Sequence, residues 1–175
     1  MIFTNTEVDI TALPVAESVD LKRVHPKYLR LLRIEWAITA VILAAIAGAL
    51  IYFNPALRAT YGWTFVAGGA LVLMGIYLLL IEKRFPHMAY AVRDHDILYQ
   101  SGWLVRTLKA CPFNRVQNCS VRSGPLERQA SLATLVLFTA GSEGADLRIP
   151  GLLQEEAESL RQFILTKIHR ERAEG

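Results

Sequence analysis

Histidines and paired carboxylates are the residues of this sequence whose types suit acid–base or metal chemistry. The tripeptide Asp94-His95-Asp96 brings the two types together. Catalysis and metal binding need groups that converge within hydrogen-bond distance, whereas adjacent residues of a turn between strands point in different directions. We therefore predict that this tripeptide is a solvated turn. The remaining histidines are scattered along the chain, at His25, His87 and His169.

Thiols and short catalytic motifs suggest no reaction either. The spacing of the only two cysteines, Cys111 and Cys119, fits neither a C-x-x-C pair nor a disulfide scaffold. We predict free thiols in a reducing compartment, with a disulfide between them as the alternative. The sequence contains no H-E-x-x-H, no nucleotide-binding glycine loop and no G-x-S-x-G elbow. It nominates no catalytic residue, metal ligand or cofactor, and we expect a protein that is not an enzyme.

Basic residues are the remaining candidates for chemistry, because they could bind phosphate groups. The net charge is +3 and the pI about 9.0, but the distribution of charge argues against nucleic acid. From His87 to the end, 11 Lys and Arg stand against 10 Asp and Glu. The excess flanks two apolar runs, and we expect membrane-surface contacts from Lys22, Arg23, Lys27, Arg30, Arg33, Lys83 and Arg84.

The two apolar runs predict a transmembrane hairpin. Residues 36–53 and 61–81 form stretches of 18 and 21 residues without a charge. Each is long enough to cross a hydrocarbon core of about 30 Å as a helix. Buried helices of a soluble protein are the alternative, but such helices usually keep a polar stripe. A secretory signal is the other alternative, and the first run is too long for its apolar region.

Charges and aromatic residues predict how this hairpin lies in the membrane. The linker 54–60 is short and contains Pro55, so the helices must be antiparallel neighbours. Its single basic residue, against the clusters outside the runs, predicts that both the N- and the C-terminus lie in the cytoplasm. Neither run holds a charge, so a transport path within this chain lacks its usual signature. Aromatic side chains expected at the headgroup level are Trp36, Tyr52, Tyr61 and Trp63.

Small residues recur on both predicted helices and permit close helix packing. They are Ala40, Ala44 and Gly48 on the first helix and Gly68 and Gly75 on the second. We favour packing inside the hairpin, because helices joined by a short linker meet each other first. Assembly with a partner protein is the alternative.

After Pro86 the pattern changes to the alternation typical of strands. Pro150-Gly151 is expected to end the sheet, and a helix follows whose apolar face repeats at helical spacing. One such helix can cover one opening of a small barrel. The predicted strands are 88–93, 97–100, 103–108, 116–122, 132–139 and 146–149, and the helix face is Leu153, Ala157, Leu160, Ile164 and Ile168.

The sequence between residues 25 and 170 resembles the YdbS-like family of bacterial pleckstrin-homology (PH) membrane proteins. The resemblance lies in the order of two spans, residues 90–102, Gly124-Pro-Leu-Glu-Arg128 and Ala133-Thr-Leu135. Its most specific parts are P-x-x-R-V-Q at residues 112–117 and I-P-G-L at residues 149–152. It implies a seven-stranded sandwich or barrel capped by a C-terminal helix, without enzymatic activity, in a bacterial inner membrane. It also implies self-association or partnership with larger relatives bearing the same domain.

The resulting fold class is an α+β membrane protein, with an N-terminal transmembrane helical hairpin before a PH-like antiparallel β-barrel or sandwich and a C-terminal helix. The predicted divisions are a tail and basic segment at 1–33, the hairpin at 34–82, the PH-like domain at 87–170 and a tail at 171–175.

Within this resemblance, one turn and one motif bear on ligand binding. Phosphoinositide-binding PH domains grip the headgroup with a basic loop between their first strands. We align that loop with Asp94-His95-Asp96, which is acidic and would repel phosphate. Arg115 and Gln117 of the specific motif are the interaction or structural candidates. We favour an ion pair of Arg115 with an Asp or Glu of the fold.

The function that follows is a membrane-anchored scaffold. Its PH-like domain would bind a second copy or a partner membrane protein carrying a related domain. The alternative is binding of an anionic lipid or peptide at the membrane surface, since basic juxtamembrane segments gain about 1 kcal/mol per residue near anionic lipid. We expect the lipid bilayer as a partner and neither nucleic acid nor a small-molecule substrate.

Overall fold

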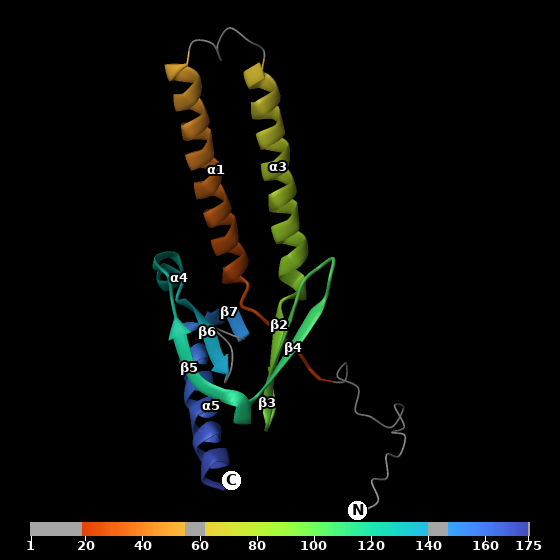
Figure 1. The fold of residues 1–175 in the computed structure, drawn as a ribbon, viewed down its shortest axis with the longest axis vertical. Coiled ribbons are helices and arrows are strands. Elements are labelled where there is room, and N and C mark those ends of the chain that lie inside the picture. Colours follow the sequence, from red (N-terminus) through yellow and green to blue (C-terminus); the bar gives the residue numbers. More distant parts are fainter. Residues whose placement is uncertain (1–18, 55–61, 140–146, 175) are drawn as a thin grey trace, which may run out of the picture.

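A computed structural model describes residues 19–54, 62–139 and 147–174, and shows a helical hairpin above a domain of two sheets (Figure 1). The hairpin consists of α1 (Lys27–Phe53) and α3 (Gly62–Arg84). Both helices begin or end beyond the apolar runs, so their basic ends project toward the β-domain. Tyr61 and the linker at 55–60 lie outside the described residues, as do residues 1–18 of the predicted N-terminal tail.

The hairpin exposes apolar side chains over most of its length, as a membrane-spanning pair does. The most apolar windows of its helices have mean hydropathies of 2.2 and 1.8, and 0% and 6% of their residues are buried. Two polar interactions between described residues join the helices. The indole N–H of Trp36 donates to the carbonyl oxygen of Met74 at 3.0 Å. Arg33 binds both carboxylate oxygens of Glu82 at 2.6 and 2.9 Å.

The prediction that small residues pack the hairpin internally is wrong for its glycines. A Cβ atom added at Gly48, Gly68 or Gly75 would meet nothing within 4 Å. These glycines therefore do not mediate close packing between the two helices. The helices meet instead through larger side chains near their lower ends, as the Trp36 and Arg33 contacts illustrate.

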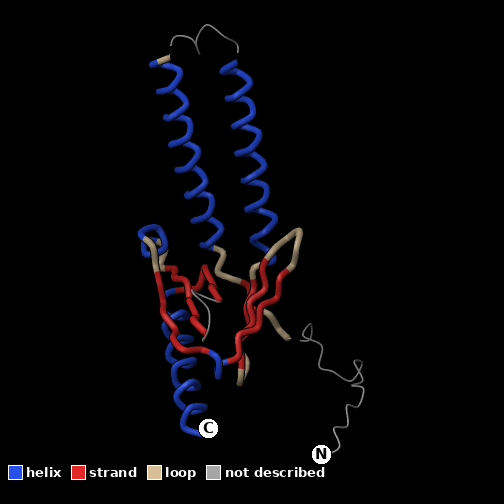
Figure 2. Tube along the Cα trace, viewed as in Figure 1, coloured by secondary structure: helices blue, strands red, loops and turns tan. Residues whose placement is uncertain are grey.

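The seven strands of the described residues form two antiparallel sheets below the hairpin (Figure 2). The first has the order β1-β2-β3-β4 and the second β5-β6-β7. The strand bounds are β1 (Lys22–Arg23), β2 (Ala89–Val92), β3 (Asp96–Ser101), β4 (Thr107–Pro112), β5 (Val116–Arg122), β6 (Leu132–Thr139) and β7 (Leu147–Leu153). Short helices lie between them at η3 (Phe85–His87), η4 (Phe113–Arg115) and α4 (Pro125–Gln129). The predicted antiparallel architecture is confirmed.

The first strand precedes the hairpin, which corrects the predicted division of the chain. Lys22 pairs with Tyr90 and Arg23 with Ala89, so β1 belongs to the same sheet as β2. The hairpin is thus an insertion between two paired strands, and the β-domain includes residues before the predicted boundary at 33 as well as after 87. A strand of two residues carries no periodicity, which is why the sequence did not reveal it.

Two predicted strand limits are also wrong. Residues 103–106 form a turn and β4 begins only at Thr107, because Gly102 has a φ of +100° and reverses the chain. Pro150 and Gly151 do not end the sheet but lie inside β7. The register between β6 and β7 shifts there, so that Thr134 alone faces both residues. Such a bulge accommodates a proline that has no N–H and a glycine with a φ of +71°.

The core lies between the two sheets and is closed by α5 (Gln154–Glu174). This helix buries Ala157, Ile164 and Ile168 against β5, β6 and η4, as its apolar spacing predicts. Cys111 and Cys119 are buried in the same cluster and are not joined by a disulfide, as predicted. Burial raises the pKa of the Cys119 thiol to about 11.

The first turn of α1 is joined to β7 through Gly151. The backbone N–H of His25 donates to the Gly151 carbonyl oxygen at 2.8 Å. The ring of Tyr28 covers the glycine so closely that an added Cβ would lie 2.6 Å from Tyr28 Cγ. Only glycine fits both this contact and the positive φ. The I-P-G-L motif is therefore the place where the hairpin rests on the β-domain.

We predict that Gly151→Ala destabilises the protein by about 1–3 kcal/mol, through the strained backbone conformation and the overlap with Tyr28. Thermal unfolding in detergent should show a lower midpoint. Gly75→Ala is the matched control, because open space surrounds that glycine. The double variant Tyr28→Ala/Gly151→Ala should lose less than the sum of the two single changes, and strict additivity would contradict the contact.

Candidate functional site

A cavity of about 550 Å³ lies where the hairpin meets the β-domain. Its volume falls in the range of small-molecule pockets. Most of its lining is aliphatic or aromatic, with two arginines and no carboxylate: Tyr28, Leu32, Tyr77, Leu80, Ile81, Arg84, Phe85, Met88, Tyr99, Trp103, Leu104, Thr134, Arg148 and Pro150. An apolar cavity with a few cationic groups suits an amphiphilic anion.

Both halves of the molecule are needed to build this cavity. Tyr28 and Leu32 come from the first turns of α1, and Tyr77 and Leu80 from the last turns of α3. Tyr99 lies on β3, whereas Arg148 and Pro150 lie on β7 of the other sheet. These elements meet because β1 and β2 return both helix ends to one sheet, and because Tyr28 rests on Gly151.

Two arginines from different elements provide the charge of the cavity. Arg84 ends α3 and Arg148 lies on β7, and both are exposed. Neither forms an ion pair with a carboxylate of the described residues, so both guanidinium groups keep their hydrogen-bonding capacity. The nearby Glu127 accepts hydrogen bonds from Gly124 N at 2.7 Å and Thr134 Oγ1 at 2.9 Å, which occupy its carboxylate within α4 and β6.

Tyr99 contributes a protonated phenol to the same wall. Burial raises its pKa to about 12, and the charge of Arg84 acts in the opposite direction. The hydroxyl therefore stays a hydrogen-bond donor at every physiological pH.

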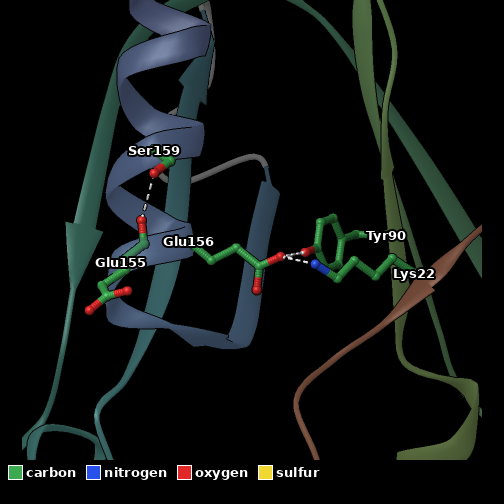
Figure 3. A network of polar contacts seen from close by, with 5 residues as sticks. All are labelled: Lys22, Tyr90, Glu155, Glu156 and Ser159. Atoms are coloured by element: carbon green, nitrogen blue, oxygen red, sulfur yellow. Dashed lines mark hydrogen bonds and ion pairs between the residues drawn. The ribbon is translucent and has the colours of Figure 1, made fainter.

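The basic residues predicted at the membrane surface have different surroundings in the structure. Arg84 lines the cavity, whereas Arg33 is held by Glu82. Lys22 lies on β1 and binds Glu156 at the start of α5, and the Tyr90 hydroxyl donates to the same carboxylate (Figure 3). The other four are exposed and form no ion pair with a described residue: Arg23, Lys27, Arg30 and Lys83.

The motif residues Arg115 and Gln117 lie elsewhere. Both are exposed, at the end of η4 and the start of β5. Arg115 lines a second cavity of about 290 Å³ together with Lys109, Thr139 and Leu147. The predicted ion pair of Arg115 is absent among the described residues, so neither side chain contributes to the junction cavity.

Asp94-His95-Asp96 is a surface turn, as predicted. Arg93 pairs with Asp96, Lys167 lies 3.5 Å from Asp94, and the His95 carbonyl accepts from Phe113 N at 2.9 Å. Among the described residues no cluster of His, Cys, Asp and Glu could hold a metal ion. The alignment with the phosphoinositide loop is wrong, however. This turn joins the second and third strands, and the hairpin itself connects the first two.

Sequence reasoning missed most of the cavity. Tyr28, Tyr99, Trp103 and Arg148 are far apart in the chain and carry no shared motif. Only two local features of the sequence pointed to residues of the cavity: Gly151 beside a proline, and the apolar Trp-Leu-Val segment after Gly102.

The fold and the cavity together define a membrane-anchored protein of the PH type. The family model described as "Bacterial PH domain" matches residues 12–168, which include β1, the hairpin and all the other strands. The chain belongs to this bacterial PH domain family. It is similar to the UPF0699 transmembrane protein YdbS of Bacillus subtilis (strain 168), at 30% identity over 135 residues, or 74% of this chain and 83% of that protein. No solved structure matches the chain.

The Glu156 contacts generate a prediction about pH. Burial acts to raise the pKa of this carboxyl, but the Lys22 ammonium and the Tyr90 hydroxyl outweigh it and hold the pKa below its usual value. A lowered folded-state pKa stabilises the fold above the unfolded-state pKa, and this contribution is lost as pH falls through the folded-state value. Lys22 is 68% exposed, so the contribution is on the order of 1 kcal/mol or less.

We therefore expect Glu156→Gln to lower the free energy of unfolding at pH 7 and to converge with wild type below about pH 4, near the Glu reference range. Chemical unfolding across this pH range, in one detergent, measures the difference. Glu155→Gln removes a charge from the same helical turn and should change the pH profile less. Parallel profiles for wild type and Glu156→Gln would refute the assignment.

Proposed function

We propose that this bacterial PH-domain protein binds an anionic lipid in the junction cavity. The observation that carries the proposal is the pairing of Arg84 and Arg148 with an otherwise apolar lining. Arginine holds phosphate through two parallel hydrogen bonds, and the aromatic wall would receive the apolar part of the ligand. A purely cytoplasmic anion would gain nothing from that wall.

The position of the cavity favours a lipid over a peptide. Tyr77 and Leu80 belong to the apolar run of α3, and Arg84 follows it directly. Residues 77 and 84 are about 10 Å apart along a helix axis, at about 1.5 Å per residue. This span matches the transition from acyl chains to headgroups. A ligand already in the membrane would meet its apolar surroundings and the two arginines without leaving the bilayer.

The basic residues at the lower hairpin end support a cytoplasmic β-domain in a bacterial inner membrane, because such charges accumulate on the cytoplasmic side. Neither the family description nor that of the relative names an enzymatic activity. For this reason, and because the sequence contains no catalytic motif, we propose a binding protein rather than an enzyme.

Lipid binding can be tested with the full chain in detergent, titrated with short-chain phosphatidylglycerol or phosphatidylcholine. Trp103 lines the cavity, so its fluorescence should report occupancy. We expect phosphatidylglycerol to bind more tightly, and Arg84→Gln or Arg148→Gln to weaken its binding by about tenfold or more, since a charged hydrogen bond contributes roughly 1.5–3 kcal/mol.

Lys83→Gln is the matched control for these variants. It removes the same charge from the adjacent residue of α3, which does not line the cavity. Its affinity should stay within about twofold of wild type, because exposed charges contribute little at a distance. Equal binding of both lipids, or equal weakening by all three variants, would refute a site at the cavity.

Self-association is a second candidate function, favoured by the edge strand β4. This strand pairs only with β3 among the described residues, and Thr107, Leu108, Lys109 and Ala110 are all exposed. An unpaired edge with both faces open can add a strand from a second copy or a related domain.

For this candidate we expect a dimer in mild detergent by light scattering. Leu108→Lys places a charge on the edge and should shift the mass toward the monomer. Lys109→Ala keeps the edge free of added charge and should leave the mass unchanged. A strict monomer at all concentrations would rule out self-association.

A further inference from the structure

The turn between β3 and β4 presents three consecutive apolar side chains to solvent. Trp103, Leu104 and Val105 are 44%, 85% and 74% exposed. We call residues 102–106 the apical turn. Soluble surfaces seldom display such a run, because each exposed apolar group orders water without compensation. The turn also lies at the end of the sheet nearest to the hairpin, beside the lower end of α3 (Figure 1).

The backbone holds this turn in a defined shape. Gly102 has a φ of +100°, and a Cβ atom there would overlap the Val105 carbonyl oxygen. The flanking strands are paired continuously from Asp96 with Pro112 to Ser101 with Thr107. The two strands therefore carry the apolar turn to its position as one paired ribbon.

The depth of the turn follows from its neighbours. Trp103 and Leu104 line the same cavity as Tyr77 and Leu80, which belong to the apolar run of α3. Lys83 and Arg84 are about one turn further along that helix, where phosphate groups are expected. The apical turn thus lies level with the last turns of the membrane span.

The charges around the turn suit an anionic membrane surface. Arg106 follows the apolar residues directly, and Lys109 follows three residues later on β4. The sequence contains no Asp or Glu from residue 97 to residue 126. A tryptophan beside aliphatic residues and a flanking arginine is the composition preferred at the boundary of headgroups and acyl chains.

We propose that the apical turn inserts Trp103, Leu104 and Val105 into the bilayer spanned by the hairpin, in the leaflet on the side of the β-domain. The β-domain then has a second membrane attachment besides the helix ends, which fixes its tilt. This proposal depends on the hairpin spanning a bilayer. It shares Trp103 and Leu104 with the junction cavity, but it does not require a lipid to be bound there.

Site-directed fluorescence tests the insertion. The full chain with Leu104→Cys is labelled with an environment-sensitive fluorophore and placed in nanodiscs of phosphatidylcholine and phosphatidylglycerol. Cys111 and Cys119 are buried, and wild type treated with the same fluorophore reports any background labelling at them. Asp94→Cys is the matched control, because Asp94 is an exposed residue of the turn at the opposite end of the sheet, with a side chain that is 87% exposed.

We expect the probe at position 104 to be quenched several-fold more by lipids bearing a nitroxide near the headgroup than the probe at position 94. Aqueous iodide should show the reverse order. Equal quenching at both positions would overturn the proposal. Protection of position 104 from iodide without quenching by nitroxide lipid would also overturn it, because protein rather than lipid would then cover the turn.

The fluorophore itself could draw the turn into the bilayer, so a second measurement uses the intrinsic fluorescence of Trp103 instead. The difference spectrum between wild type and Trp103→Phe isolates the emission of Trp103 in the same nanodiscs. We expect this component to be blue-shifted and quenched by the nitroxide lipids. A red-shifted component that only iodide quenches would contradict the insertion.

Discussion

The pairing of β1 with β2 is the constraint on which the rest of the structure depends. These strands stand on either side of the hairpin in sequence, yet Lys22 pairs with Tyr90 and Arg23 with Ala89. The hairpin therefore leaves and re-enters one sheet at adjacent points. Glu156 adds α5 to this junction, since Lys22 and Tyr90 both bind its carboxylate. Membrane anchor and β-domain are consequently joined by a sheet rather than by a flexible linker.

This junction places an apolar cavity and an apolar turn beside the lower ends of the hairpin helices (Figure 1). The last turns of α3, the wall from β3 and the arginine from β7 meet because β1 pairs with β2 and because Tyr28 rests on Gly151. In a soluble PH-type domain, exposed Leu104 and Val105 would be a liability. Beside a bilayer the same residues can be buried in lipid. The two arginines of the cavity lie where headgroups are expected, which ties the proposed ligand to the membrane itself.

The two helices of the hairpin are held together by few contacts. Its glycines make no close contact with the partner helix, and its helices are joined near their lower ends by the Trp36 indole and by Arg33 with Glu82. In lipid, helix association gains little from burying apolar surface, because acyl chains are equally apolar. A few directional contacts near the interface can therefore hold the pair. The family match across residues 12–168 fits this view of hairpin and sheets as one unit.

Local pattern alone determined the spans, most strands and the face of α5. Eighteen uncharged residues can only be accommodated in lipid or a core, and Ala157, Ile164 and Ile168 repeat at helical spacing. Tertiary structure alone decided the role of Lys22 and Arg23, the bulge at Pro150 and Gly151, and the cavity. Two paired residues have no period, a bulge depends on the partner strand, and Tyr28, Arg84 and Arg148 meet only after long-range pairing. The periodicity of a segment reflects which of its faces is buried, and this can be read from the segment alone. A binding site depends on which distant segments come into contact, and this is decided only by the tertiary structure.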